Sequence, residues 1–142
     1  PRSTPCGTLF PYTTLFRSID AIEVSGGFLT SKTRSPSRLG INSPEKEACF
    51  QAGAAAFQQV LDIPVILVGG IRSLEKAREL VSEGGADYIS LCRPLIREPG
   101  LINRWRNGDN RPALCNSDNL CFRPAFKGEG IYCVTEQRER AE

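Results

Sequence analysis

A double-glycine turn is the first feature of the chain that could do chemistry. Residues 68–71 place Gly69 and Gly70 between an apolar run and a segment typical of a helix. Because glycine has no Cβ, backbone N–H groups can approach a phosphate closely there, and the amides that begin a helix lack internal partners. The same spacing also describes a tight strand-to-helix turn that needs glycine only for its backbone angles. The spacing alone leaves both interpretations open.

A second turn follows the next apolar segment, where Cys92 precedes Arg93. An arginine at the carboxyl end of a parallel strand faces the edge where ligands bind in α/β proteins. Its guanidinium can hold a phosphate with two hydrogen bonds. The alternative is a surface arginine paired with Glu98 or Asp87. Two such turns after consecutive strands form the recurring phosphate site of (β/α)8 barrels, so together they are more specific than either alone.

Composition excludes several other kinds of chemistry. The 142 residues contain no histidine, which excludes Ser-His-Asp and Cys-His catalysis within the chain. The chain has 18 basic and 16 acidic residues, and the basic residues are scattered and form no stripe. We therefore expect no nucleic-acid partner. No apolar run reaches the roughly 18 residues of a membrane span. The α/β pattern and the absence of a secretory segment favour a cytoplasmic protein without disulfides.

Alternating strands and helices must position the two turns. The pattern predicts strands at residues 19–24, 64–68 and 86–91, and helices at 43–61, 74–83 and 99–107. This alternation implies an α/β fold with a parallel sheet. Residues 64–68 are uniformly apolar, so we expect both faces of that strand to be covered. In the second helix, Ser73 is the expected N-cap, and Leu74, Ala77 and Val81 are expected to face inward.

The two ends of the chain differ from its centre. Residues 1–18 scatter Pro, Thr and Ser among aromatics without a period, which favours a disordered or foreign leader over an irregular packed loop. The chain has no methionine, so we expect a processed product or a piece of a longer protein. We expect three parts: the leader at 1–18, an α/β unit at 19–110 and a cysteine-containing tail at 111–142.

Three long motifs carry a family resemblance. They read IDAIEVSGG at 19–27, PVILVGGIRS at 64–73 and GADYISLCRPLIREP at 85–99. They resemble the Old Yellow Enzyme family, the NADH:flavin oxidoreductases, from about residue 19 onward. The resemblance is to the last part of the family's FMN-binding TIM (β/α)8 barrel, strands six to eight. Residues 1–18 lie outside it.

The resemblance implies a set of FMN contacts. Family members bind the FMN phosphate through the two turns, which implies Gly69, Gly70, Cys92 and Arg93 as the cofactor-binding residues. Cys92 departs from the glycine that is frequent there, but a backbone N–H contact tolerates the change. Ser25 and Gly26 would lie near the flavin. The family's substrate-anchoring and proton-donating residues belong to earlier strands, so we assign no catalytic residue.

The cysteine tail resembles the iron–sulfur segment of the larger family members. Cys115, Cys121 and Cys133 match three of its four cysteines, and Asp118 stands at the remaining position. Four thiolates are the usual demand of a [4Fe–4S] cluster. We therefore favour a tail without a metal. The alternative is a cluster in which aspartate replaces one thiolate, and a zinc site is a further alternative. Cys6 and Cys49 show no partner spacing.

The function implied is that of an FMN-dependent NAD(P)H oxidoreductase that reduces activated C=C bonds. The chain would supply the phosphate site and would be inactive alone, because three strands cannot close a barrel. The family's members are often homo-oligomers. Two alternatives remain: a metal-binding or iron–sulfur module that works through the cysteine tail, and a phosphate-binding barrel that uses no flavin.

Overall fold

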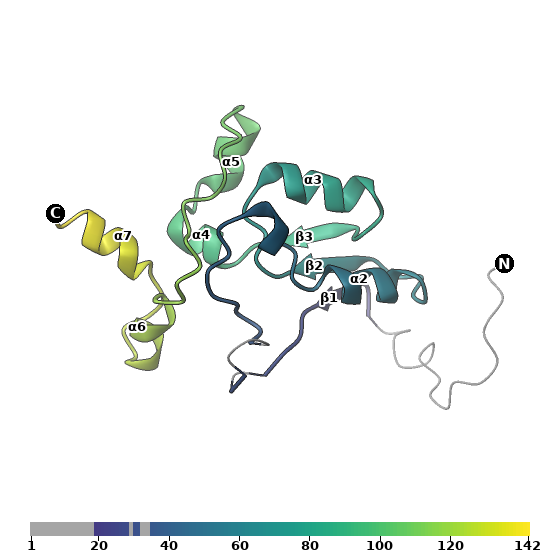
Figure 1. Cartoon of the computed structure of the whole chain (residues 1–142), viewed down its shortest axis with the longest axis horizontal. Coiled ribbons are helices and arrows are strands. Elements are labelled where there is room, and N and C mark those ends of the chain that lie inside the picture. Colours follow the sequence, from purple (N-terminus) through teal and green to yellow (C-terminus); the bar gives the residue numbers. More distant parts are fainter. Residues whose placement is uncertain (1–18, 29, 32–34) are drawn as a thin grey trace.

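A three-stranded parallel sheet lies at the centre of the computed structural model, which describes residues 19–28, 30–31 and 35–142 (Figure 1). Its strands are β1 (Ile22–Val24), β2 (Val65–Val68) and β3 (Tyr88–Ser90), in the order β1-β2-β3. Ile22 pairs with Val65, and Ile66 pairs with Tyr88. The predicted α/β class and parallel sheet are therefore confirmed. The sheet is consistent with part of a barrel, and the leader predicted at 1–18 lies outside the described residues.

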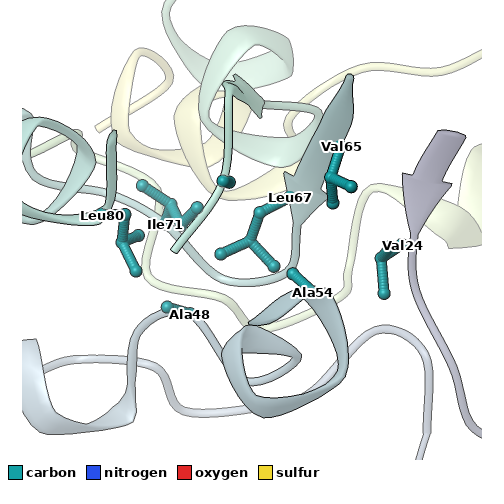
Figure 2. Packing of buried hydrophobic residues seen from close by; sticks show 8 residues of the cluster. Val24, Ala48, Ala54, Val65, Leu67, Ile71 and Leu80 are labelled. Atoms are coloured by element: carbon teal, nitrogen blue, oxygen red, sulfur yellow. The ribbon is translucent and has the colours of Figure 1, made fainter. Parts of the chain in front are cut away.

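Two helices cover one face of the sheet and form the main core with it. They are α2 (Gln51–Gln58) and α3 (Leu74–Ser82). Figure 2 shows Val24, Val65 and Leu67 on the helix-facing side of the strands, with Ala54 of α2 opposite them. Val65, Leu67 and Ala54 are fully buried, so this layer is closely packed.

The other face of β2 is less covered than the sequence predicts. Ile66 and Val68 alternate with the buried Val65 and Leu67 and are only half-buried. The expectation that both faces of this strand would be covered is therefore wrong for the described part of the chain, because α2 and α3 pack on one side only.

The helix predicted at 43–61 is broken in two. A 3₁₀ turn, η1 (Pro44–Lys46), is followed by Ala48 with a φ of 53°, and only then does α2 begin. Glu47 turns inward to bind the backbone before α3, and the Cys49 N–H donates to the carbonyl of Gly69 at 3.0 Å. These tertiary contacts replace the helical hydrogen bonds at the break.

The helix α3 matches its prediction at both ends. The Ser73 Oγ accepts a hydrogen bond from the Lys76 N–H, and Gly84 follows the helix with a φ of 70°. One inward residue was misassigned: Val81 is 45% exposed, whereas its neighbour Leu80 is 1% exposed and belongs to the core. The face that meets the sheet is thus centred one residue earlier than predicted.

Four short helices complete the chain beyond the sheet. They are α4 (Arg93–Arg97), α5 (Leu101–Arg106), α6 (Phe122–Phe126) and α7 (Val134–Glu139). Leu101 and Trp105 of α5 pack with Ala113 in a second, smaller core. Figure 1 shows α6 and α7 apart from the sheet, at the opposite end of the molecule from α2. In the described part of the chain, no helix has the length and apolar character needed to span a bilayer.

Candidate functional site at the carboxyl edge of the sheet

The structure brings the two predicted turns to the same edge of the sheet. Gly69 and Gly70 directly follow β2, and Cys92 and Arg93 follow β3 after one intervening residue, Leu91. Because β2 and β3 are adjacent and parallel, both turns leave the sheet at its carboxyl edge. This is the edge where ligands bind in α/β proteins.

The double-glycine turn is closely backed by side chains. Gly69 has a φ of 124°, and a Cβ there would lie 2.6 Å from the Phe50 ring and 2.9 Å from the Cys49 Sγ. Gly70 has a φ of 76°, and a Cβ there would lie 2.2 Å from Cδ1 of Ile41. Both positions therefore require glycine for conformation and for space, whether or not the turn also binds an anion.

The amino end of α3 is already occupied by a carboxylate. Oε2 of the buried Glu47 accepts hydrogen bonds from the Arg72 N–H at 2.9 Å, the Ser73 N–H at 3.1 Å and the Ser73 hydroxyl at 3.1 Å. Sequence spacing suggested that these first helical amides were free for a phosphate. In the structure Glu47 instead binds the two amides that precede the helix, and the Ser73 Oγ accepts from the Lys76 N–H of the first turn. The negative charge of Glu47 already lies at this end of α3, so we expect a bound phosphate to use the glycine turn itself.

Arg93 is held at the sheet edge by polar groups that carry no formal charge. Its Nη1 donates to the carbonyl of Arg38 at 2.9 Å and to Oδ1 of Asn119 at 2.6 Å. The alternative interpretation, a surface arginine paired with Glu98 or Asp87, is wrong. Glu98 pairs with an arginine of α5, and the Asp87 carboxylate accepts from Gln58 and from the backbone at the start of β2. Among the described residues the half-buried guanidinium forms no ion pair, although its charge contributes to the lowered pKa of Asp118, with which it lines one pocket.

A second arginine lies beside the first. The Arg38 guanidinium lies over the Phe50 ring, 5.4 Å from its centroid, and the Nε of Arg38 is buried without a hydrogen-bond partner. In the described part of the chain neither Arg38 nor Arg93 forms an ion pair. Burial raises the pKa of the Cys49 thiol, while the charges of both arginines act to lower it, so both guanidiniums lie near this thiol.

Sequence reasoning missed Arg38 and Asn119. Arg38 lies in an irregular stretch without helical or strand periodicity, and Asn119 lies in the tail. Asn119 is fixed by a long-range pair of hydrogen bonds: its Nδ2 donates to the carbonyl of Ser37 at 2.8 Å, and its Oδ1 accepts from the Ser37 hydroxyl at 2.9 Å. In the sequence, Arg38 and Asn119 are single polar residues in irregular segments. Such residues are too common for either one to be singled out as a candidate.

The remaining predicted contacts lie around the same edge. Cys92 is exposed at the beginning of α4, where its backbone could meet a ligand. Gly26 follows β1, and a Cβ on it would lie 3.8 Å from the Phe50 ring, so this turn also borders the aromatic side chain below Arg38. Ser25 is exposed.

The cysteine tail forms a narrow pocket on the other side of Arg93. Its thiol and carboxylate residues are Cys115, Asp118, Cys121 and Cys133. The structure thus gathers the three tail cysteines that the sequence singled out. Burial raises the pKa of the Cys121 thiol, and the nearby Cys115 adds to that effect. The five cysteines in the described part of the chain are all unpaired.

This pocket does not fit an iron–sulfur cluster or a zinc ion. Both oxygens of Asp118 are in use: Oδ1 accepts from the Leu120 N–H at 2.9 Å, and Oδ2 accepts from the Thr135 hydroxyl at 2.5 Å. Burial opposes the charge of Asp118, but these hydrogen bonds hold its pKa below the ordinary value. Across the described residues, no three His, Cys, Asp or Glu side chains lie close enough to hold a metal ion. Asp118 is a structural tie between the loop and α7.

Comparisons with known proteins give partial matches to oxidoreductases. A 4,4'-dithiodibutanoate disulfide reductase of Rhodococcus erythropolis is 31% identical over 60% of the chain and 21% of its own length. A metal reductase of Desulforamulus reducens is 29% identical over 82% of the chain and 17% of its length. An NADH oxidase of Thermoanaerobacter brockii is 37% identical over 47% of the chain and 10% of its length. The chain is thus similar to oxidoreductases and spans about a fifth or less of their length.

Shorter matches point to another class of protein. The imidazole glycerol phosphate synthase subunit HisF of Aeromonas salmonicida is 48% identical over 32% of the chain and 18% of its own length. No protein-family model matches the chain.

Proposed function

We propose that this chain carries the FMN-phosphate-binding part of an FMN-dependent NAD(P)H oxidoreductase of the Old Yellow Enzyme type. The supporting observation is a carboxyl edge that carries two arginines, in a chain that is similar to reductases over 60% and 82% of its length. There the double-glycine turn and Arg93 follow neighbouring parallel strands, and no acidic side chain among the described residues forms an ion pair with the arginine. The three strands would then be the sixth to eighth of a (β/α)8 barrel.

Each residue of the edge has a distinct role in this proposal. Gly69 and Gly70 bring backbone to the phosphate without a Cβ between them, and Arg93 supplies a guanidinium. Cys92 contributes its backbone. FMN, when bound, supplies hydride transfer from NAD(P)H to an activated C=C bond. The chain itself binds and orients the cofactor, and no described residue is assigned to proton transfer.

The test is a flavin titration that separates the phosphate from the ring. We expect FMN to bind more tightly than riboflavin, and Arg93→Ala to weaken FMN about tenfold or more while leaving riboflavin unchanged. Arg106→Ala is the matched control, because it removes the same charge from an exposed position on α5. Equal binding of FMN and riboflavin by the unaltered chain would contradict the proposal.

A second candidate is a phosphate-binding barrel that uses no flavin, favoured by the HisF matches. A barrel of this kind would also explain the double-glycine turn and the turn that contains Arg93. The disulfide reductase and metal reductase matches extend over 60% and 82% of the chain, compared with 32% and 44% for two HisF matches, and for that reason we prefer the flavin-binding function. If the chain binds inorganic phosphate and shows no preference for FMN, the phosphate-binding barrel without flavin becomes the preferred function.

A further inference from the structure

We propose that Arg38 is a second phosphate-binding side chain, which forms with Arg93 a clamp of two guanidinium groups at the double-glycine turn. The identity of the ligand as FMN rests on the proposed function above. The clamp itself is inferred from the contacts and charges of Arg38 and is testable with phosphate alone.

The position of Arg38 is set by two neighbouring contacts. Its guanidinium lies over the Phe50 ring, and that ring backs Gly69, where it leaves no room for a Cβ. The carbonyl of Arg38 accepts a hydrogen bond from Arg93, which ties the two arginines together at 2.9 Å. Arg38 and Cys49 also line one open groove, together with Glu45 and Glu47. Arg38 is therefore part of the same edge as the two predicted turns.

The charge of Arg38 has no partner in the described part of the chain. Its Nε is buried and makes no hydrogen bond, and the side chain forms no ion pair. Burying a guanidinium without an acceptor is costly, whereas an anion bound between two such groups removes the cost. The cation–π contact with Phe50 orients the group but does not satisfy its N–H donors.

Arg72 shows what a purely structural arginine looks like in this fold. Its Nε is also buried without a partner, but its Nη1 donates to the carbonyl of Ile41 at 2.5 Å and its Nη2 to that of Ala113 at 2.8 Å. Arg72 thus joins two loops of the chain. Among the residues that the structure describes, no such backbone acceptor engages the Arg38 side chain, and this distinguishes Arg38 from Arg72.

Two guanidinium groups favour one class of ligand. A phosphate monoester carries nearly two negative charges at neutral pH, which matches the two positive charges of Arg38 and Arg93. A diester carries one charge and would leave one guanidinium uncompensated. The clamp therefore selects a terminal phosphate, such as that of FMN, over the bridging phosphates of a dinucleotide.

The experiment measures binding of FMN, riboflavin and inorganic phosphate to the whole chain and to four variants. They are Arg38→Ala, Arg38→Lys, Arg93→Ala and, as the control, Arg78→Ala, which removes a charge from the exposed side of α3. Flavin fluorescence reports the flavins, and phosphorus NMR line broadening reports inorganic phosphate. We expect Arg38→Ala to weaken FMN and phosphate about tenfold or more, with partial recovery in Arg38→Lys and no change in riboflavin binding. Circular dichroism verifies that each variant is folded.

The outcomes separate this proposal from the proposed function. If Arg93→Ala weakens FMN but both Arg38 variants bind like Arg78→Ala, the clamp is overturned and the flavin function stands. If phosphate binds in an Arg38-dependent manner but neither flavin binds, the clamp stands and the flavin function is overturned. If the unaltered chain binds neither phosphate nor FMN, both are overturned.

Discussion

Replacing Gly70 with alanine tests whether packing against Ile41, in addition to backbone conformation, requires glycine at this position. Gly70 has a φ of 76°, and a Cβ there would lie 2.2 Å from Cδ1 of Ile41, which is 2% exposed and cannot move aside freely. An alanine in the left-handed region costs about 1–2 kcal/mol. Overpacking a filled core adds about 1–3 kcal/mol. We expect Gly70→Ala to lower the free energy of unfolding by about 2–5 kcal/mol.

Gly84→Ala is the matched control. Gly84 has nearly the same φ, 70°, but a Cβ there would have no atom within 4 Å. It should therefore cost only the conformational part, about 1–2 kcal/mol. Urea unfolding followed by circular dichroism and by the single tryptophan, Trp105, measures both variants.

A second-site change isolates the packing contribution. Ile41→Val removes the Cδ1 atom and leaves the other Ile41 atoms at 3.5 Å or more from the added Cβ. Gly70→Ala should therefore cost about 1–3 kcal/mol less in the Ile41→Val background. Equal destabilisation by Gly70→Ala and Gly84→Ala, without recovery in the double variant, would refute the packing argument.

Three further predictions concern the groups around this turn. Asn119→Ala removes an acceptor of Arg93, so FMN affinity should fall severalfold in a fluorescence titration while riboflavin affinity stays constant; unchanged FMN affinity would count against a positioning role. Glu47→Ala leaves three donors before α3 unpaired and should lower the free energy of unfolding by about 2–4 kcal/mol, with Glu47→Gln costing less because it keeps an acceptor; equal urea midpoints would contradict this. Burial raises the pKa of the Cys49 and Cys121 thiols, so their contribution to stability is complete below the unfolded thiol pKa and is lost as the pH rises through the folded value. Urea unfolding above pH 9 should therefore become less pH-dependent in Cys49→Ala and Cys121→Ala, and an unaltered slope would exclude this linkage.

The local sequence pattern predicted β2 and α3 correctly. It failed where contacts between residues far apart in the chain determine the backbone conformation. The apolar run that forms β2 and the capped repeat that forms α3 carry their own signals, so both were predicted to within a residue or two. The helix expected from residue 43 to residue 61 has equally good local signals. It breaks because Glu47 binds the backbone ahead of α3, which no local pattern encodes.

The residues of the candidate site also separate into those that the sequence predicted and those that only the tertiary structure reveals. Gly69, Gly70 and Arg93 were predicted from their place after strands, and Cys92 from the family resemblance; the topology brings all four to one edge. Arg38 and Asn119 reach that edge from irregular segments, through contacts with residues far away in the chain. The roles of all six in binding a phosphate stay predictions.

The contacts of Arg72 have a consequence for the order of folding. The shortest connection in the sheet joins β2 to β3 through α3, whereas β1 must close a longer loop to reach β2. Loop closure costs more entropy as the loop lengthens, so the β2–α3–β3 unit is the natural nucleus. We therefore expect the segments around residues 41 and 113, whose carbonyls accept hydrogen bonds from Arg72, to dock onto that nucleus last. Weakening those contacts should accelerate unfolding and leave the folding rate nearly unchanged.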